Sequence, residues 1–439
     1  MVWQGCLRAA VRALVVTLIV LGSLPFILTK PHIGVYMWSW LGYMNPHRLA
    51  WATALPYAQI VAAVTLLAII FTKEERKIPW TREAVLLLIF VLWMWFTTFF
   101  AQYQDVAWLK WDKVWKVQLF IFITLMFINT RERLQILVWV IVVSIGFFGV
   151  KGGIFTIRSG GTQLVLGPEG SFIATRGEIG TALNMVLPLM RYLQLTMTKW
   201  WAKYAFTGAM VLTVLAIVGT SSRGAFLGTL VVMAFLFIKS RGKFMMLIFI
   251  AATAYGAYTF APPEWKERMH SIETYEQDAS AMGRIEAWKY IIRVTADSPI
   301  VGGGFDITAG RTAAHSIYFQ ILGDHGYVGL ALFLALGFMT WRTGSWVRKQ
   351  AKKHTELQWA GDLAAMTQVG MAAYAVGGAF ISQAYFDLIY HYMAIIVILK
   401  MLTMKYLLEH GMLRTELRGA FRGTRGAPGT GYAEKRKGD

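Results

Sequence analysis

Cysteine is almost absent from this chain. Cys6 is the one cysteine among 439 residues, so an intrachain disulfide and a cysteine-based metal cluster are excluded. Charge is scarce as well, because 15% of the residues are charged, against about 25% in average usage. Together with a hydrophobic content of 56%, this deficit excludes an ordinary soluble globular protein.

Several motifs of common enzyme chemistry are also missing. The sequence has no phosphate-binding loop of the Gly-x-x-x-x-Gly-Lys-Ser/Thr type and no His-Glu-x-x-His zinc pattern. No dense acidic cluster outside the membrane indicates a metal pair, and we predict no cofactor. A convincing internal repeat is lacking too, and this weakens the interpretation as an inverted-repeat transporter.

Long apolar runs recur instead, and they are long enough to cross the roughly 30 Å hydrocarbon core of a bilayer. They are far longer than the strands of a membrane barrel, so the sequence predicts an all-α polytopic membrane protein. The first run lacks a small-residue cleavage site, and we interpret it as a retained helix rather than a signal peptide. We predict about twelve spans, near 10–28, 54–72, 83–101, 116–129, 135–152, 173–194, 204–220, 224–239, 244–260, 315–340, 363–385 and 388–407.

The net charge of +19 lies largely in short loops and in the C-terminal tail. In these places the positive charge determines the topology and binds anionic lipid, so we predict membrane lipids and no nucleic acid as partners. The basic loops fall on one side of the membrane, at 73–77, 131–133, 199–203, 239–243 and 342–353, and the tail after Lys405 joins them. The positive-inside rule makes this side cytoplasmic and predicts that both termini are cytoplasmic.

Longer intervals fall on the other side, at 29–53, 153–172 and 261–314. The first two are rich in glycine and aromatic residues, so we expect them to lie at the membrane interface or to re-enter a protein-lined cavity. In the third, apolar groups recur at helical spacing after Arg284, and Pro299 ends the pattern. We therefore predict one membrane domain over 1–410, with a helical cap in the outer loop 261–314, and a disordered basic tail over 411–439.

The most distinctive polar stretch opens an apolar helix with His315 and continues to Asp324 and His325. Ionisable groups are costly in a spanning helix, so such a stretch is a functional-site hypothesis by default. Arg311 would lie about one turn before His315 if the helix extends that far. At this point two interpretations of His315 stay open, an interfacial histidine that caps the helix and a functional group.

Asp324 lies nine residues after His315, which is roughly 13 Å deeper along a helix. The two side chains therefore cannot form a dyad. We expect Asp324 and His325 to be a structural polar pair that holds the helix to its neighbours. Gly326 and Gly329 follow, and we expect them to let helices approach closely.

Arginines on the outer side are the next candidates. Arg223 follows Thr220-Ser-Ser in a tight outer turn between two spans, and a guanidinium beside hydroxyl groups suits a phosphate. Arg284 begins the cap helix, and Arg176 begins the sixth span. The alternatives are a snorkelling arginine for Arg223 and a surface charge for Arg284. Asp387 and His391, one turn apart, could bind a metal or assist an acid–base step, but a solitary pair is a weak indication.

These pieces, in this order, resemble the O-antigen ligase and O-antigen polymerase superfamily of bacterial envelopes. The matching motifs cover roughly residues 222–333, and the span plan covers the rest: Ser222-Arg-Gly-Ala225, Arg284-x-x-x-Trp288, Pro299-Ile-Val-Gly-Gly-Gly-Phe305 and His315-Ser-x-Tyr-x-Gln-x-Leu-x-Asp324-x-Gly326-x-x-Gly329-Leu330. Two positions depart mildly from the pattern, since Ser316 stands where many members have Asn and Asp324 where many have Glu. The region 172–190 looks more like the ligase branches than like typical polymerases.

The resemblance implies a C-type glycosyltransferase-like fold in the bacterial inner membrane, with its active site facing the periplasm. Such an enzyme transfers a glycan from undecaprenyl diphosphate to a hydroxyl of lipid A-core oligosaccharide, with inversion and without a metal. Histidine can serve as the base for the acceptor hydroxyl, which assigns His315 as catalytic. The negative charge of the leaving diphosphate must be stabilised by arginines, and we assign Arg223 and Arg284 as the diphosphate-binding residues. Arg176, Arg311 and Asp387 are further candidates.

Related functions remain as alternatives. An O-antigen polymerase or a protein O-glycosylation ligase would use a similar site. A membrane transporter or lipid flippase belongs to another class and would place polar residues along a midplane path. The candidate polar groups concentrate at the outer face instead, and this favours an enzyme.

Overall fold

The computed structural model describes residues 2–50, 55–239, 251, 255 and 279–412. Within these ranges the protein consists of helices, and the described residues form no β-strand. The helices are α1 (Val2–Thr29), α2 (Pro31–Met44), α3 (Pro46–Ala50), α4 (Tyr57–Phe71), α5 (Arg82–Thr98), α6 (Gln104–Phe127), α7 (Arg131–Arg158), α8 (Arg176–Thr196), α9 (Trp200–Gly219), α10 (Arg223–Lys239), α13 (Ala279–Asp297), α14 (Ile317–Ala351), α15 (Gln358–Gly377) and α16 (Asp387–Glu409), with short 3₁₀ helices at η2 (Thr355–Leu357) and η3 (Gly378–Phe380).

Among the described residues, six helical segments are long and apolar enough to cross a membrane. They are Ala10–Thr29, Arg131–Arg158, Trp200–Gly219, Ile317–Ala351, Thr355–Phe380 and Asp387–Glu409. The predicted all-α class is therefore confirmed for this part of the chain, whereas the number of twelve spans stays a prediction. Nearly all of the expected span at 244–260, residues 261–278 of the expected outer loop and the tail from residue 413 onward lie outside the described residues.

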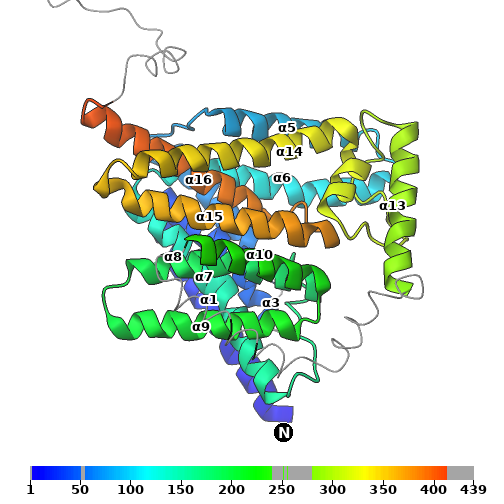
Figure 1. The fold of residues 1–439 in the computed structure, drawn as a ribbon, viewed down its shortest axis with the longest axis horizontal. Helices are drawn as coiled ribbons and strands as arrows, with labels where there is room; N and C mark the ends of the chain where they lie inside the picture. The colour runs from blue at the N-terminus through cyan, green and yellow to red at the C-terminus, as the bar shows by residue number, and fades with distance from the viewer. Residues whose placement is uncertain (1, 51–54, 240–250, 252–254, 256–278, 413–439) are drawn as a thin grey trace, which may run out of the picture.

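Most of the long helices run along a common direction, and α13 runs across their ends (Figure 1). α7 packs along α9, α8 along α15, and α14 against α5, α15 and α16. The interior lies around α8 and α16, which contain continuous buried runs from Ile179 to Met190 and from Tyr390 to Leu399. A helix that is apolar on all sides must be buried in this way or face lipid.

Polar contacts gather several basic loops at one end of the bundle, which we call the basic end. Arg133, at the start of α7, donates hydrogen bonds to both carboxylate oxygens of Glu74, at 2.8 and 3.2 Å. The guanidinium of Arg131 lies 4.7 Å from the ring centre of Trp359, at the start of α15. Helices α8, α10, α14 and α16 begin at the other end, which we call the opposite end.

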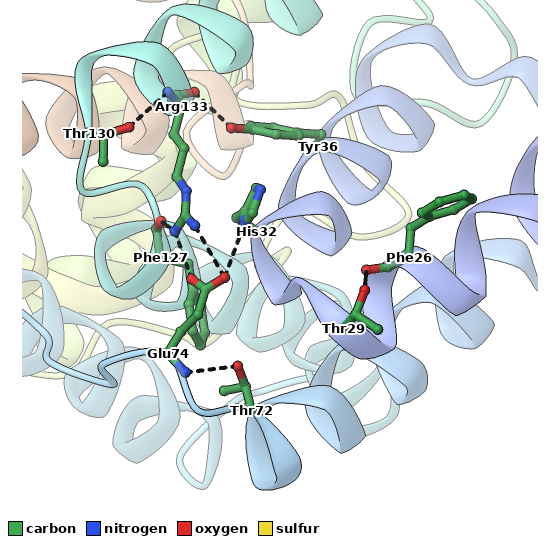
Figure 2. A network of polar contacts seen from close by, with 9 residues as sticks. All are labelled: Phe26, Thr29, His32, Tyr36, Thr72, Glu74, Phe127, Thr130 and Arg133. Carbon is green, nitrogen blue, oxygen red and sulfur yellow. Dashed lines mark hydrogen bonds and ion pairs between the residues drawn. The ribbon is translucent and has the colours of Figure 1, made fainter.

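The structure corrects the prediction that residues 29–53 form an outer interval. His32, at the start of α2, lies at the basic end, where its Nδ1 is 3.5 Å from Glu74 (Figure 2). Near the last turn of α2, the hydroxyl of Tyr43 lies 2.7 Å from Nδ1 of His391, which is in the first turns of α16. Helix α2 therefore runs through the bundle. Its 14 residues extend only about 21 Å, which is why the sequence pattern did not predict a span.

Because α2 runs through the bundle, the orientation of α1 also differs from the predicted one. The hydroxyl of Thr17 lies 2.5 Å from that of Tyr57, at the start of α4. Because α4 ends beside Glu74 and α2 begins beside it, α1 reaches the basic end with its last residues rather than its first. The beginning of α1 consequently points toward the opposite end, whereas the charge pattern predicted that both termini lie on the basic side.

Candidate active site

Helices α8, α10 and α14 begin close together at the opposite end, and local sequence determines where each starts. Thr175 caps α8 through a reciprocal pair of hydrogen bonds, in which its backbone N–H donates to Glu178 at 2.9 Å and Glu178 N–H donates to its hydroxyl. In α10, Ala225 N–H donates to the Ser222 hydroxyl at 3.4 Å. Such helix starts carry partial positive charge on their free N–H groups, so they form an environment that suits an anion.

Small residues bring these helix starts into contact. A Cβ atom on Gly180 of α8 would lie 2.5 Å from that of Ala225 in α10. A Cβ atom on Gly224 would lie 2.7 Å from that of Phe380, and one on Gly378 would lie 2.7 Å from the side chain of Ile317. The 3₁₀ helix η3 therefore joins the starts of α10 and α14, and a side chain at these glycines would separate them.

Two non-glycine residues next to these helix starts have left-handed backbone conformations. Ser221 has a φ of 50°, and His315 has a φ of 46°. Such conformations cost roughly 1–3 kcal/mol each, persist where the surroundings hold them, and cluster at functional sites. For His315 the holding contact is a hydrogen bond of 2.8 Å from its backbone N–H to the Ser382 hydroxyl.

The His315 imidazole lies in the connection before α14 and is half-buried. Burial lowers its pKa below the ordinary value of 6.5, and the positive charges of Arg284 and Arg176 lower it further. The structure thus brings both of these predicted arginines within electrostatic range of the predicted base. A neutral imidazole near neutral pH has a free nitrogen lone pair and can accept a proton.

Helix α13 is fixed to the segment around His315 by Trp288. The indole Nε1 donates to the carbonyl of Ala314 at 2.7 Å, and the indole ring stacks on Phe319 with a centroid distance of 4.8 Å. Arg284 lies one turn before Trp288 on the same helix. The Arg-x-x-x-Trp spacing thus pairs an anchoring residue with a charged one.

Arg311 is not part of the helix that follows His315. Helix α14 begins at Ile317, and the Arg311 guanidinium stacks instead on the ring of Tyr290 in α13, at 4.4 Å. The helix therefore does not extend back to Arg311, and the one-turn spacing to His315 that this extension would have given is absent. The backbone before Ile317 is not helical, and His315 itself has a left-handed φ of 46°.

Asp324 and His325 are buried away from His315 and bond to other elements. The Tyr385 hydroxyl donates to the Asp324 carboxylate at 2.6 Å and lies 2.9 Å from His325 Nε2. On the other side of the ring, the Thr97 hydroxyl of α5 lies 2.7 Å from His325 Nδ1. These contacts agree with the structural role that we expected, because they join α14 to α5 and to the segment before α16.

Gly326 has a role different from the predicted helix packing. It interrupts α14 with a φ of 69° and a ψ of −171°. A Cβ atom there would lie 2.2 Å from the carbonyl oxygen of Ile300, and Tyr327 N–H donates to Pro299 at 2.9 Å. The glycine is required because the outer loop packs against a kink in the helix.

Asp387 and His391 lie between α16 and α2. The Asp387 carboxylate approaches Gly42, where a Cβ atom would be 3.3 Å away, while His391 contacts Tyr43 and Ser39. In the part of the chain that the structure describes, no three His, Cys, Asp or Glu side chains gather as metal ligands. Asp387 and His391 therefore form a polar contact between α16 and α2.

Sequence reasoning missed Ser382 and the Thr175–Glu178 cap. The pattern Thr-x-x-Glu before an apolar run is a recognisable capping signal. Ser382 has no comparable signal, because its partner lies 67 residues earlier in the chain.

Two regions of the chain match known protein families. Residues 11–198 match a family of unknown function (DUF5935). Residues 208–334 match the O-antigen ligase family, and this region contains Arg223, Arg284 and His315 but neither Arg176 nor Asp387. The search of curated proteins gives no match.

Proposed function

Because residues 208–334 carry a domain of the O-antigen ligase and polymerase superfamily, we propose that this membrane protein is an O-antigen ligase. It would transfer a glycan from undecaprenyl diphosphate to a hydroxyl of lipid A-core oligosaccharide, at the periplasmic face of the bacterial inner membrane. The observation that carries the proposal is that His315 of this domain lies within electrostatic range of Arg284 and Arg176, beside adjoining helix starts.

His315 is the proposed base. Attack of the acceptor hydroxyl on the anomeric carbon, with inversion, requires removal of the hydroxyl proton as the new bond forms. The lowered pKa keeps the imidazole neutral near neutral pH, so it is available for this proton. The Ser382 hydrogen bond holds the residue in position at the end of the outer loop.

The leaving diphosphate gains negative charge as the bond to the anomeric carbon breaks, and this charge needs preorganised positive groups. Arg223 is the first residue of α10, and Arg176 is the first residue of α8. Each guanidinium is therefore joined to a helix start whose N–H groups favour an anion. Arg284, from α13, completes the proposed diphosphate environment, and no step requires a metal ion.

Helix α13 would position the donor sugar and the acceptor. It crosses the ends of the other helices (Figure 1) and is anchored beside His315 through Trp288. Fixing two reactants in one orientation removes much of the entropic barrier to their reaction. In this proposal the domain over 1–410 supplies the membrane scaffold, and its loop 261–314 supplies the cap.

The direct test uses the purified protein with an undecaprenyl-diphosphate-linked glycan and lipid A-core, and follows transfer by gel mobility. His315→Ala should reduce transfer by at least about 100-fold, within the range of general-base effects, while the variant remains folded. His410→Ala is the matched control, because His410 is exposed at the end of α16. Near-normal transfer by His315→Ala would refute the assignment of the base.

The related alternatives have different cellular outcomes. Loss of a ligase leaves polymer on undecaprenyl diphosphate together with bare lipid A-core. Loss of a polymerase prevents formation of the polymer itself, and loss of a protein glycosylation ligase removes glycoproteins instead. Glycan banding in a strain that lacks the protein therefore separates these functions.

A further inference from the structure

A cavity of about 790 Å³ lies beside the last turns of α7, and its size falls in the range of ligand sites. Its lining is mostly apolar, with Phe148, Phe155 and Leu166 among the contributing side chains. Arg48, Lys151 and Glu169 also line it. The cavity therefore combines an apolar surface with more cationic than anionic groups.

This cavity is distinct from the proposed active site. None of Arg176, Arg223, Arg284 and His315 is among its described lining residues. One wall is the segment around Val165, whose N–H donates to the carbonyl of Gly219 at 3.0 Å. Gly219 ends α9 just before the turn to Arg223, so this segment stands between the cavity and that turn.

Lys151 is the unusual group in the cavity. It lies seven residues before the end of α7, which is roughly 10 Å along the helix axis, and its side chain is exposed. Among the residues that the structure describes, no carboxylate lies within ion-pair distance of its ammonium group. Helix α7 begins at Arg131, so Lys151 lies about 30 Å along its axis, which is close to the thickness of the hydrocarbon core. A lysine at this depth reaches the level of the lipid phosphates.

Arg48 supplies a second cation and is held in place by the backbone. Its Nη1 donates to the main-chain carbonyl of Glu169 at 2.6 Å, a neutral partner that leaves the charge of the guanidinium in place. Phe155 and Leu166 on the cavity wall are 39% and 60% exposed. The apolar part of the cavity is thus open at the surface of the bundle, where a spanning helix meets lipid.

We propose that this cavity binds an anionic phospholipid of the membrane. Its phosphate would lie against Lys151 and Arg48, because both cations face a mostly apolar cavity. Its acyl chains would lie along Phe148, Phe155 and Leu166, where burial of apolar surface contributes affinity. The proposed base and arginines do not line this cavity, and the proposal is independent of the proposed enzymatic reaction.

Native mass spectrometry of the purified full-length protein tests this, with phosphatidylglycerol and phosphatidylcholine added in turn at equal concentration. The wild type should retain phosphatidylglycerol at least threefold better than phosphatidylcholine. Lys151→Gln and Arg48→Gln should each abolish most of this preference, and Lys151→Arg should keep it. Arg158→Gln is the matched control, because Arg158 is an exposed cation at the end of the same helix outside the cavity lining.

Leu166→Trp tests the apolar half of the site without changing a charge, and it should reduce retention of both lipids. Equal retention of the two lipids by the wild type, or an equal loss in Arg158→Gln, would overturn the proposal. Complete displacement by millimolar inorganic phosphate would show a site for free anions instead. Displacement by undecaprenyl diphosphate that depends on Lys151 would assign the cavity to the donor. Thermal unfolding of each variant ensures that only folded protein is compared.

Discussion

The backbone N–H of His315 donates a hydrogen bond of 2.8 Å to the hydroxyl of Ser382, in the segment between η3 and α16. His315 has a left-handed φ of 46°, so this contact helps to hold a conformation that an isolated histidine would rarely adopt. The proposed base is thereby positioned by a part of the chain outside the family-matched region 208–334. This hydrogen bond joins the segment before α14, which contains the proposed base, to the segment before α16.

Ser382→Ala should slow transfer by about 10-fold, because loss of the contact releases strain of order 1–3 kcal/mol and frees His315 to leave its position. The effect should appear in kcat with little change in KM for the lipid-linked donor. Steady-state kinetics in detergent provide the measurement. Ser382→Thr keeps the hydroxyl and should retain most activity, and an equal loss in both variants would contradict a positioning role.

The pH dependence of transfer should follow His315. A base acts in its neutral form, so activity should rise with pH through the His315 pKa and then become constant. Because burial, Arg284 and Arg176 all lower this pKa, the rise should lie below pH 6.5. Arg176→Gln and Arg284→Gln should each move it to higher pH, since a positive charge that disfavours the imidazolium is removed. An unchanged midpoint in both variants would show that another group titrates.

Tyr385→Phe should destabilise the protein by about 2–3 kcal/mol, because it leaves the buried Asp324 carboxyl without its 2.6 Å partner. The same change removes the contact with His325. Tyr390→Phe is the matched control, because that hydroxyl makes one hydrogen bond to a backbone carbonyl, and its loss should cost about 1 kcal/mol. Thermal unfolding in detergent compares the two variants, and equal shifts would count against the Asp324–Tyr385–His325 network.

Gly326→Ala should be strongly destabilising, by roughly 2–4 kcal/mol, since alanine combines a positive φ with a clash against a backbone carbonyl. The added Cβ would lie 2.2 Å from the oxygen of Ile300. Gly337→Ala in the same helix has open space around the new atom and should be neutral or slightly stabilising. Expression level and unfolding temperature measure the difference, and equal behaviour of the two variants would remove the kink as an explanation.

The position of α1 predicts that the two chain termini lie on different sides of the membrane. The contact between Thr17 and Tyr57 and the place of His32 beside Glu74 orient α1 toward the basic end. Protease protection of tags in sealed vesicles should therefore show the N-terminal tag on one side and the C-terminal tag on the other. Both tags on the same side would restore the arrangement expected from the charge pattern.

Much of the architecture follows from the sequence alone, because it depends on local properties. Long apolar runs can satisfy their backbone groups in a membrane only as helices or closed barrels, and their length indicates helices. The helical rise separates Asp324 from His315 without any knowledge of the fold. The spacing of Arg284 and Trp288 likewise places an anchor and a charge one turn apart on α13.

Other features were decided by tertiary structure alone. Helix α2 is too short to predict as a span. Its residue His32 nevertheless contacts Glu74 at the basic end, and its residue Tyr43 contacts His391 in α16, so the helix runs through the bundle. The partners of His315 and Asp324 come from Ser382 and Tyr385, more than 60 residues away in the chain. Helical periodicity extends over only a few turns, whereas these contacts depend on how distant segments pack. The sequence therefore determined which residues could carry the chemistry, and packing determined which of them lie together.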